Sequence, residues 1–260
     1  MFELPKKMLV MLCLGFSSGL PYIILITTSS AWLKDSDVSL TYIGFFAWLT
    51  FAYVFKFLWA PLVDRFSIPI FKRYGHRKSW ILATQIIIIF SIFILSLLSP
   101  QINFTIFCMV AFVIAVAGSF QDIAIDAFRI EYAEIADQGN LAAAYQLGYR
   151  LAIIMAASFG LIFADLYGWS LTYKLLSIAM LIGVVGTIFS KEVTNEKLGR
   201  LTFVNSIIEP LLDFFTRFKW YIASMLLLII ATYRLTDIVM GPMATPFYLE
   251  MGFSLTEIGS

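Results

Sequence analysis

The chain has 260 residues, of which 60% are hydrophobic, 17% are aromatic and 13% are charged, and its formal net charge is +1. Soluble domains hold roughly 45–50% apolar and about 25% charged residues, so this composition excludes an ordinary soluble fold, a disordered chain and a collagen-like protein. The two cysteines and one histidine exclude a disulfide scaffold and a zinc module, and the nearly neutral charge excludes bulk attraction to nucleic acid.

Seven apolar stretches are long enough to cross a membrane as helices, which requires about 20 apolar residues. They lie at residues 8–33, 40–63, 79–100, 102–130, 142–166, 169–190 and 221–250. Helices are expected because lipid leaves no partner for open backbone groups and because no stretch alternates as a barrel strand does. We therefore predict an all-α membrane protein with seven transmembrane helices.

Lysine and arginine residues mark one side of the predicted membrane. They gather before the first helix, between the second and third, and after the sixth, whereas the connections at 99–102 and 165–169 contain none. Because basic connections stay in the cytoplasm, we expect a multi-pass protein with a cytoplasmic N-terminus. Residues 191–220 are expected to form a cytoplasmic linker between a six-helix bundle at 1–190 and a further segment at 221–260.

One six-residue segment occurs twice, 215 positions apart. Ser-Leu-Thr-Tyr-Ile-Gly occupies 39–44, at the start of the second predicted helix, and Ser-Leu-Thr-Glu-Ile-Gly occupies 254–259, after the seventh. The seventh helix would then repeat the first. Two parallel six-helix halves are the architecture of major-facilitator transporters. We therefore expect a six-helix bundle of the major-facilitator type, followed by the first helix and the truncated start of a second half.

Four motifs between residues 14 and 150 resemble the AmpG family of muropeptide permeases. They are Leu-Gly-Phe-Ser-Ser-Gly-Leu-Pro-Tyr at 14–22, Lys-Phe-Leu-Trp-Ala-Pro-Leu-Val-Asp-Arg at 56–65, Gln-Asp-Ile-Ala-Ile-Asp-Ala at 121–127 and Gly-Tyr-Arg at 148–150. The resemblance implies a bacterial inner-membrane protein that imports anhydromuropeptides with protons for peptidoglycan recycling. It also implies at least twelve spanning helices, so the expected partners are membrane lipid and a separately encoded second half.

Other functions stay open as alternatives. The motif at 121–127 is also similar to acetyl-CoA transporters, so another solute carrier is one alternative. A non-transporting remnant is a second, and residues 1–260 alone are expected to give no uptake, because alternating access needs two opposing halves. An enzyme is not expected: the segment at 15–19 fits the Gly-x-Ser-x-Gly pattern, but His76, the only histidine, lies in a predicted loop. The sequence predicts neither a metal site nor a cofactor.

Charged residues within the predicted helices indicate where the functional site lies. Each costs on the order of 2.5–3.5 kcal/mol at a helix centre, so such residues usually line a cavity or pair with one another. Asp122 and Asp126 are neighbours one helical turn apart that oppose joint ionisation, and either is a candidate for proton coupling. The expected helix directions place Lys56 and Arg150 in the same cytoplasmic layer as this pair.

Candidates for substrate binding come from charge and from resemblance. A basic side chain could bind a substrate carboxylate, and the alternative for each charged residue is a structural ion pair. The candidates from charge and depth are Lys56, Arg150, Arg234 and Asp237, and the motif resemblance adds Gln121 and Tyr149.

Two glycine–proline pairs predict breaks in helices. Gly19 with Pro21 should weaken the first helix, and Gly241 with Pro242 should weaken the seventh, because proline removes a backbone donor. Broken helices near the middle of the membrane are typical of a binding site or a hinge, and a harmless kink is the alternative.

The connection after the second predicted helix resembles the major-facilitator signature. Its residues are Asp64 and Arg65, followed by Arg77 after an insertion. The resemblance implies that Asp64 caps a helix end and that the two arginines pair with acidic groups, forming a latch that holds one conformation. The alternative is a basic loop that only sets the topology.

Overall fold

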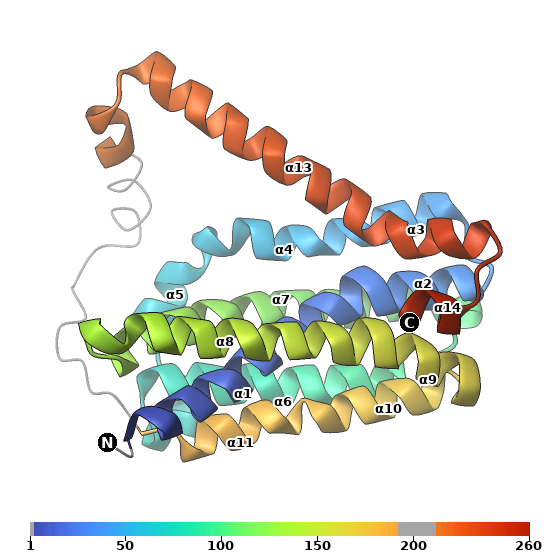
Figure 1. Ribbon diagram of the computed structural model, residues 1–260, viewed down its shortest axis with the longest axis horizontal. Coiled ribbons are helices and arrows are strands. Elements are labelled where there is room, and N and C mark those ends of the chain that lie inside the picture. Colours follow the sequence, from blue (N-terminus) through green and yellow to red (C-terminus); the bar gives the residue numbers. More distant parts are fainter. Residues whose placement is uncertain (1–2, 192–211) are drawn as a thin grey trace.

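The computed structural model of the protein describes residues 3–191 and 212–260. The described part is helical and contains no strand, and most of its helices run side by side along the longest axis (Figure 1). Six of its helical segments are long and apolar enough to cross a membrane, which confirms the all-α membrane class. They are Leu4–Asp35, Leu40–Leu58, His76–Leu95, Pro100–Tyr132, Ile135–Tyr167 and Trp169–Phe189.

The seventh predicted span coincides with a helix, α13 (Trp220–Glu250). Within the described residues its clearly apolar part is Trp220–Ile230, which is shorter than a full span, so the seventh crossing stays a prediction. The expected interruption at Gly241 and Pro242 is absent, because α13 continues through both residues. Proline removes only one backbone donor, and membrane helices tolerate that loss where neighbouring groups satisfy the freed carbonyl.

The first and fifth spans each contain one wide turn. In the first span, α1 (Glu3–Ile23) continues through a π-helical turn at Ile24–Thr28 into α2 (Ser29–Asp35). In the fifth, α8 (Gln138–Ile153) continues through a π-helical turn at Ile154–Phe159 into α9 (Gly160–Tyr167). The weakening predicted near Pro21 is therefore a local widening that follows the proline, and the helix itself is not interrupted.

The second span is the least regular. Its α-helical pieces α3 (Leu40–Ala47), α4 (Phe51–Val54) and α5 (Ala60–Arg65) are joined by 3₁₀ turns at Trp48–Thr50 and Phe55–Leu58. Further described elements are a 3₁₀ segment at Pro69–Tyr74, α6 (His76–Leu95), α7 (Pro100–Tyr132), a 3₁₀ turn at Ile135–Asp137, α10 (Trp169–Ala179), α11 (Leu181–Phe189) and α14 (Leu255–Gly259), and residues 212–217 are also helical.

Small residues allow α1 to pack closely against its neighbours. A Cβ on Gly15 would lie 2.0 Å from the carbonyl oxygen of Tyr145, and a Cβ on Gly148 would lie 2.0 Å from that of Leu12, so the α1 and α8 backbones almost touch. Gly186 of α11 leaves similar room for Cys13 of α1. Contacts of this kind bring membrane helices together where the hydrophobic effect between them is weak.

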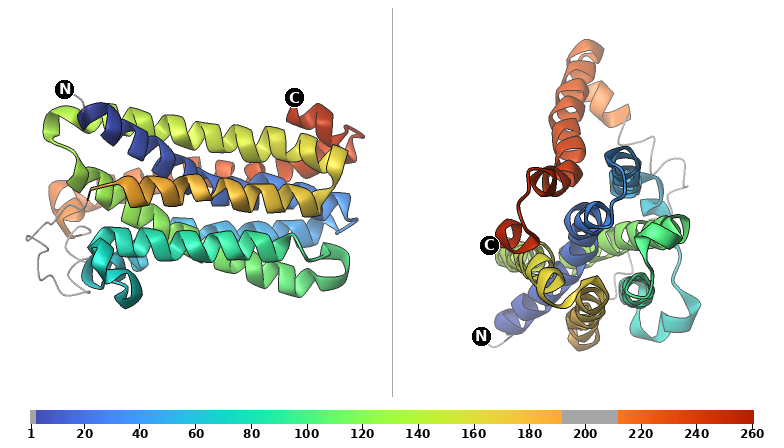
Figure 2. Two further views of the ribbon diagram at one scale, coloured as in Figure 1. Left: turned by 90° about the horizontal axis from the view of Figure 1, so that it is seen from below. Right: turned by 90° about the vertical axis from the view of Figure 1, so that its right-hand side faces the viewer.

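The bundle has two distinct ends. At the end that we call the basic end, α1 and α6 begin and α5 ends, and its residues include Lys6, Lys7 and Arg65; α2 and α9 finish at the opposite, far end (Figure 1). The segments α13 and α14 contact the bundle at the far end, against α2, α3 and α9, and α13 then leans away toward the basic end (Figures 1 and 2). Lys34 and Glu250 face each other there at 3.9 Å.

The internal repeat is also a repeat of backbone geometry. Asp37 and Gly252, 215 positions apart, have φ of 58° and 92°. In the first turn the amide of Val38 donates to the carbonyl of Leu33 at 3.0 Å, and in the second Phe253 donates to Tyr248, again 215 positions on, at 3.2 Å. Both turns are Schellman-type helix ends, so the α2–α3 and α13–α14 junctions are built alike.

Candidate functional site

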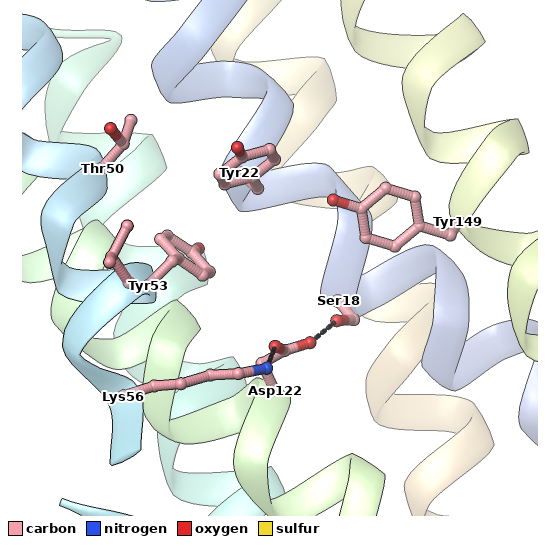
Figure 3. A pocket seen from close by; sticks show the side chains of 8 residues that line it. Ser18, Tyr22, Thr50, Tyr53, Lys56, Asp122 and Tyr149 are labelled. Carbon is pink, nitrogen blue, oxygen red and sulfur yellow. Dashed lines mark hydrogen bonds and ion pairs between the residues drawn. The ribbon is translucent and has the colours of Figure 1, made fainter. Parts of the chain in front are cut away.

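A polar pocket of about 340 Å³ opens inside the bundle, between the first, second, fourth and fifth spans. Figure 3 shows hydroxyl, amino and carboxylate groups from these spans turned toward one another. The residues that line the pocket are Ser18, Tyr22, Thr50, Tyr53, Val54, Lys56, Asp122 and Tyr149.

Asp122 of α7 is the centre of the pocket's hydrogen bonding. Its Oδ2 pairs with the Lys56 ammonium, and its Oδ1 accepts from the Ser18 hydroxyl at 2.7 Å. The Tyr145 hydroxyl lies 2.9 Å from Ser18 Oγ, to which it donates, and 3.2 Å from Asp122 Oδ1. These contacts to both oxygens of Asp122 tie three helical spans to α7.

Asp126, one turn further along α7, is held more loosely. Its Oδ2 lies 3.6 Å from Lys56 Nζ and its Oδ1 lies 3.7 Å from the Arg129 guanidinium. Its side chain is 40% exposed, against 17% for Asp122. One lysine therefore bridges two carboxylates, of which one is enclosed and one is accessible.

Three tyrosines form the aromatic part of the pocket wall. The rings of Tyr22 and Tyr53 meet edge to face with centroids 5.0 Å apart, and Tyr149 faces them from α8 (Figure 3). The Tyr53 hydroxyl is buried and has no hydrogen-bond partner among the described residues. Aromatic faces with hydroxyl edges suit a ligand that carries both apolar and polar groups.

The structure brings some of the predicted site residues together and leaves others apart. Lys56, Asp122 and Asp126 converge as expected, and Tyr149 lines the same pocket. Arg150 is exposed and forms no ion pair with any described residue. It follows Tyr149 by one position, a rotation of about 100° around the helix, so the two side chains leave α8 in different directions.

Gln121 lies behind the pocket. It is fully buried, and its amide nitrogen donates to the Ser17 carbonyl at 2.7 Å, which fastens α7 to α1. The structure therefore places Gln121 between helices, away from the pocket lining. The side chains of Arg234 and Asp237 lie outside the described residues, so their predicted roles stay predictions.

The signature residues form an ion-pair cluster at the basic end. Arg77, at the start of α6, donates to Asp64 at 2.6 Å and to Glu131 of α7 at 2.9 Å, so it joins three helices. Asp64 accepts from Arg77 and does not cap the start of α6, where the capping position is Gly75. Arg65 lies over the Phe66 ring at 6.0 Å and has no ion pair within the described chain, contrary to expectation.

The sequence analysis missed several pocket residues, although a signal was present. Ser18 and Tyr22 are four apart, as are Tyr145 and Tyr149, so each pair shares a helix face just as the two aspartates do. Polar pairs at this spacing in apolar helices mark the face that turns to a cavity. Within the described residues no group of three metal-ligating side chains occurs.

The six candidate spans and the ion-paired pocket between them are the features of a membrane transport protein. The chain belongs to the Major Facilitator Superfamily, whose family model matches residues 8–260.

Two relatives indicate which members of the superfamily the chain is similar to. The chain is 35% identical to the anhydromuropeptide permease of Escherichia coli strain K12 over 260 residues, covering 99% of this chain and 52% of the permease. It is 33% identical to the putative transporter AmpG 4 of Rickettsia conorii over 255 residues, covering 94% of this chain and 60% of that protein. These similarities confirm the AmpG resemblance. The chain thus spans about half to three-fifths of the length of these curated relatives.

Proposed function

We propose that this protein takes part in proton-coupled import of anhydromuropeptides across the bacterial inner membrane, with its N-terminus and basic end in the cytoplasm. In this proposal residues 1–190 form the six-helix half of the transporter, residues 191–220 link it to the segment at 221–260, and a second half completes the translocation path. The observation that carries the proposal is that Lys56, which lines the pocket with Asp122, also contacts Asp126. The named relatives support the choice of substrate.

The two aspartates would have different roles in transport. Asp122 already accepts from Lys56 and Ser18, so its carboxylate is the fixed partner. Asp126 is more exposed and has only longer contacts, so it is the acid that we propose takes up and releases the proton. A proton on Asp126 removes one of the two charges that hold Lys56, which frees the ammonium to meet a carboxylate of the substrate.

The remaining pocket residues would bind the substrate by its other features. Tyr22 and Tyr149 offer ring faces for the sugar and hydroxyls for its polar groups. The Tyr53 hydroxyl has no partner among the described residues, and in this proposal it donates a hydrogen bond to the ligand. Arg150 is exposed and stays a proposed contact for a second carboxylate of the peptide.

Uptake of labelled anhydromuropeptide tests the proposal. The chain would be fused to the part of the Escherichia coli permease that follows the matched segment and expressed in cells that lack their own permease. We expect the fusion to take up label in a manner that a protonophore abolishes, and residues 1–260 alone to give none. Uptake of acetyl-CoA in place of muropeptide would favour the other carrier.

Substitutions in the fusion test the site. Lys56→Met and Asp122→Asn should abolish uptake, and Asp126→Asn should uncouple it from the proton gradient. Asp213→Asn is the matched control, because Asp213 is exposed, lies outside the candidate spans and, within the described chain, forms an ion pair with Arg217 at 2.8 Å. Full uptake by Lys56→Met, with normal membrane levels of the protein, would contradict the proposal.

A further inference from the structure

Behind the pocket, a chain of buried hydrogen bonds crosses four of the candidate spans. It consists of Gln121 of α7, Ser17 of α1, Gln85 of α6 and Thr187 of α11, and all four residues are fully buried. The Gln85 amide nitrogen donates to Ser17 Oγ at 3.3 Å, and Gln85 Oε1 accepts from the Thr187 hydroxyl at 3.0 Å. A buried amide is costly without hydrogen bonds, so this chain accounts for both ends of the Gln85 side chain.

Ser17 Oγ is the point at which the two glutamines meet. Its hydrogen is donated to the Leu14 carbonyl at 3.0 Å, and its oxygen accepts from Gln121 at 3.2 Å and from Gln85 at 3.3 Å. A hydroxyl has one donor and two acceptor sites, so Ser17 Oγ is saturated. Both glutamines must present their NH₂ groups to it, which turns Gln85 Oε1 toward Thr187.

The same region is closely packed. A Cβ on Gly183 of α11 would lie 2.2 Å from Ser17 Cβ and 2.9 Å from Gln85 Nε2. The absence of a side chain at Gly183 lets α11 bring Thr187, one turn further on, within reach of Gln85. Close packing leaves the Ser17 side chain little room to move, so a change at Gln85 is passed on to α1.

The chain of hydrogen bonds continues into the pocket through neighbours in the sequence, because Ser17 precedes Ser18 and Gln121 precedes Asp122. In the rear pair, Gln121 donates to the Ser17 carbonyl at 2.7 Å. In the front pair, the Ser18 hydroxyl donates to Asp122 at 2.7 Å. Adjacent residues leave a helix about 100° apart, so α1 and α7 are joined along two lines of contact. A shift of one helix along the other would disturb both.

We propose that Gln85 is a positioning residue for Asp122. By holding Ser17 it fixes the height of α1 against α7 at which the Ser18 hydroxyl reaches the Asp122 carboxylate. Asp122 in turn holds Lys56, which lies on the irregular second span. The alternative is that Gln85 only joins α6 to α1 and α11, without effect on the pocket. The importance of Asp122 for transport rests on the proposed function, whereas the positioning itself does not depend on the substrate.

A double-mutant cycle on residues 1–260 tests the positioning without transport. Gln85→Met keeps the length of the side chain and removes both of its hydrogen bonds, and Asp122→Asn weakens the front contact. Gln85 and Asp122 share no hydrogen-bond partner among the described residues, so their effects on the melting temperature should add if Gln85 only links helices. We expect the double variant to lose clearly less than the sum, because either change alone loosens the contact between α1 and α7.

Gln101→Met is the matched control for the cycle. Gln101 is exposed and lies about 30 Å from Asp122 along α7, so its effect should add to that of Asp122→Asn. Thr187→Val is a milder second variant that removes the donor to Gln85 Oε1, and its effect should overlap with that of Asp122→Asn to a smaller degree. If Gln85→Met does not fold, this variant decides the question in the same way. Additive losses in these cycles would overturn the proposal.

Uptake kinetics of the fusion separate positioning from stability. A variant that only folds less well should lower the maximal rate of uptake at an unchanged KM. Gln85→Met should instead raise the KM for labelled anhydromuropeptide several-fold, because a displaced Asp122 no longer holds Lys56 in place for the substrate. An unchanged KM would overturn the proposal. No uptake by the unsubstituted fusion would count against the proposed function alone, and the unfolding cycle would still decide the role of Gln85.

Discussion

Gly15 of α1 and Tyr145 of α8 approach so closely that a Cβ on the glycine would lie 2.0 Å from the tyrosine carbonyl oxygen. The same is true of Gly148 and the Leu12 carbonyl, so the contact is made from both sides. We predict that Gly15→Ala or Gly148→Ala pushes the helices apart and destabilises the protein by about 1–3 kcal/mol. Thermal unfolding of the purified protein in detergent measures the effect.

Gly139 provides the matched control for these substitutions. It lies in the first turn of α8, and a Cβ there would meet nothing within 4 Å. Gly139→Ala should therefore preserve or slightly raise the melting temperature, because alanine is the better helix former. A loss for Gly139→Ala as large as that for Gly148→Ala would contradict the assignment of the Gly148→Ala loss to helix contact.

The pairing of Lys56 with Asp122 should appear as an energetic coupling. Either Lys56→Met or Asp122→Asn leaves one charge without its main partner, whereas the double variant removes both charges. We predict a coupling energy of about 0.5–3 kcal/mol in a double-mutant cycle followed by thermal unfolding. The exposed pair Asp213–Arg217 should give a coupling near zero, since solvent screens it. Strict additivity at Lys56 and Asp122 would contradict the pairing.

Removal of the Tyr53 hydroxyl should make the protein more stable and reduce its transport activity. Its buried hydroxyl has no partner within the described chain, so Tyr53→Phe should raise the melting temperature by removing a group that costs about 1–3 kcal/mol to bury unpaired. A Cβ on Gly118 would lie 2.0 Å from this hydroxyl, so Gly118→Ala should destabilise the protein and Tyr53→Phe should partly rescue it. If the hydroxyl binds substrate, uptake by the fusion falls while stability rises.

The three-helix contact of Arg77 should depend on the shape of the guanidinium. Arg77 reaches Asp64 and Glu131 at once, which a lysine ammonium cannot do with the same geometry. We predict that Arg77→Lys destabilises the basic end and speeds proteolytic cleavage there. Arg65→Lys, on an exposed neighbour without an ion pair among the described residues, should leave cleavage unchanged. Equal cleavage rates for the two variants would refute the role of Arg77.

Glu257 gives a prediction on pH. Its carboxylate accepts from the amide and hydroxyl of Ser254, and these hydrogen bonds lower the pKa of Glu257 below its usual value. Because the folded pKa is lowered, the cap is complete at neutral pH and is lost as the pH falls through that pKa. Carboxyl NMR of the labelled residue should show the low midpoint, and Ser254→Ala should return it to the usual range.

The level of a residue along its helix could be predicted from the sequence, whereas the direction in which its side chain points could not. Counting residues from the membrane edges placed Lys56 and Asp122 at one level, because every helix rises about 1.5 Å per residue. Whether a side chain at that level turns inward depends on packing, so Arg150 did not join the cluster and Gln121 lies behind it. The spacing of Tyr145 and Tyr149 carried the missing information, since residues four apart share a face.

The irregular second span had a signal for only one of its two 3₁₀ turns. Pro61 follows the turn at Phe55–Leu58, and its missing N–H deprives the Phe57 carbonyl of its helical hydrogen bond. The turn at Trp48–Thr50 contains neither glycine nor proline, and it depends on how this span meets its neighbours, which a single sequence does not reveal. The π-helical turn after Pro21 could be predicted, because the proline indicated where the helix would depart from regular α-helical geometry.

The 3₁₀ turns make the helical span that carries Lys56 less firmly held than α7, which carries its partner Asp122. Lys56 is carried by a span in which 22% of the most apolar stretch is buried, compared with 67% in the α1–α2 span. Asp122 is carried by α7, a 33-residue helix whose Gln121 is fastened to α1. Rupture of the pair would therefore leave α7 in place and let the segmented second span move. The span that carries Lys56 is therefore the mobile partner of the ion pair, and α7, which carries Asp122, is the fixed one.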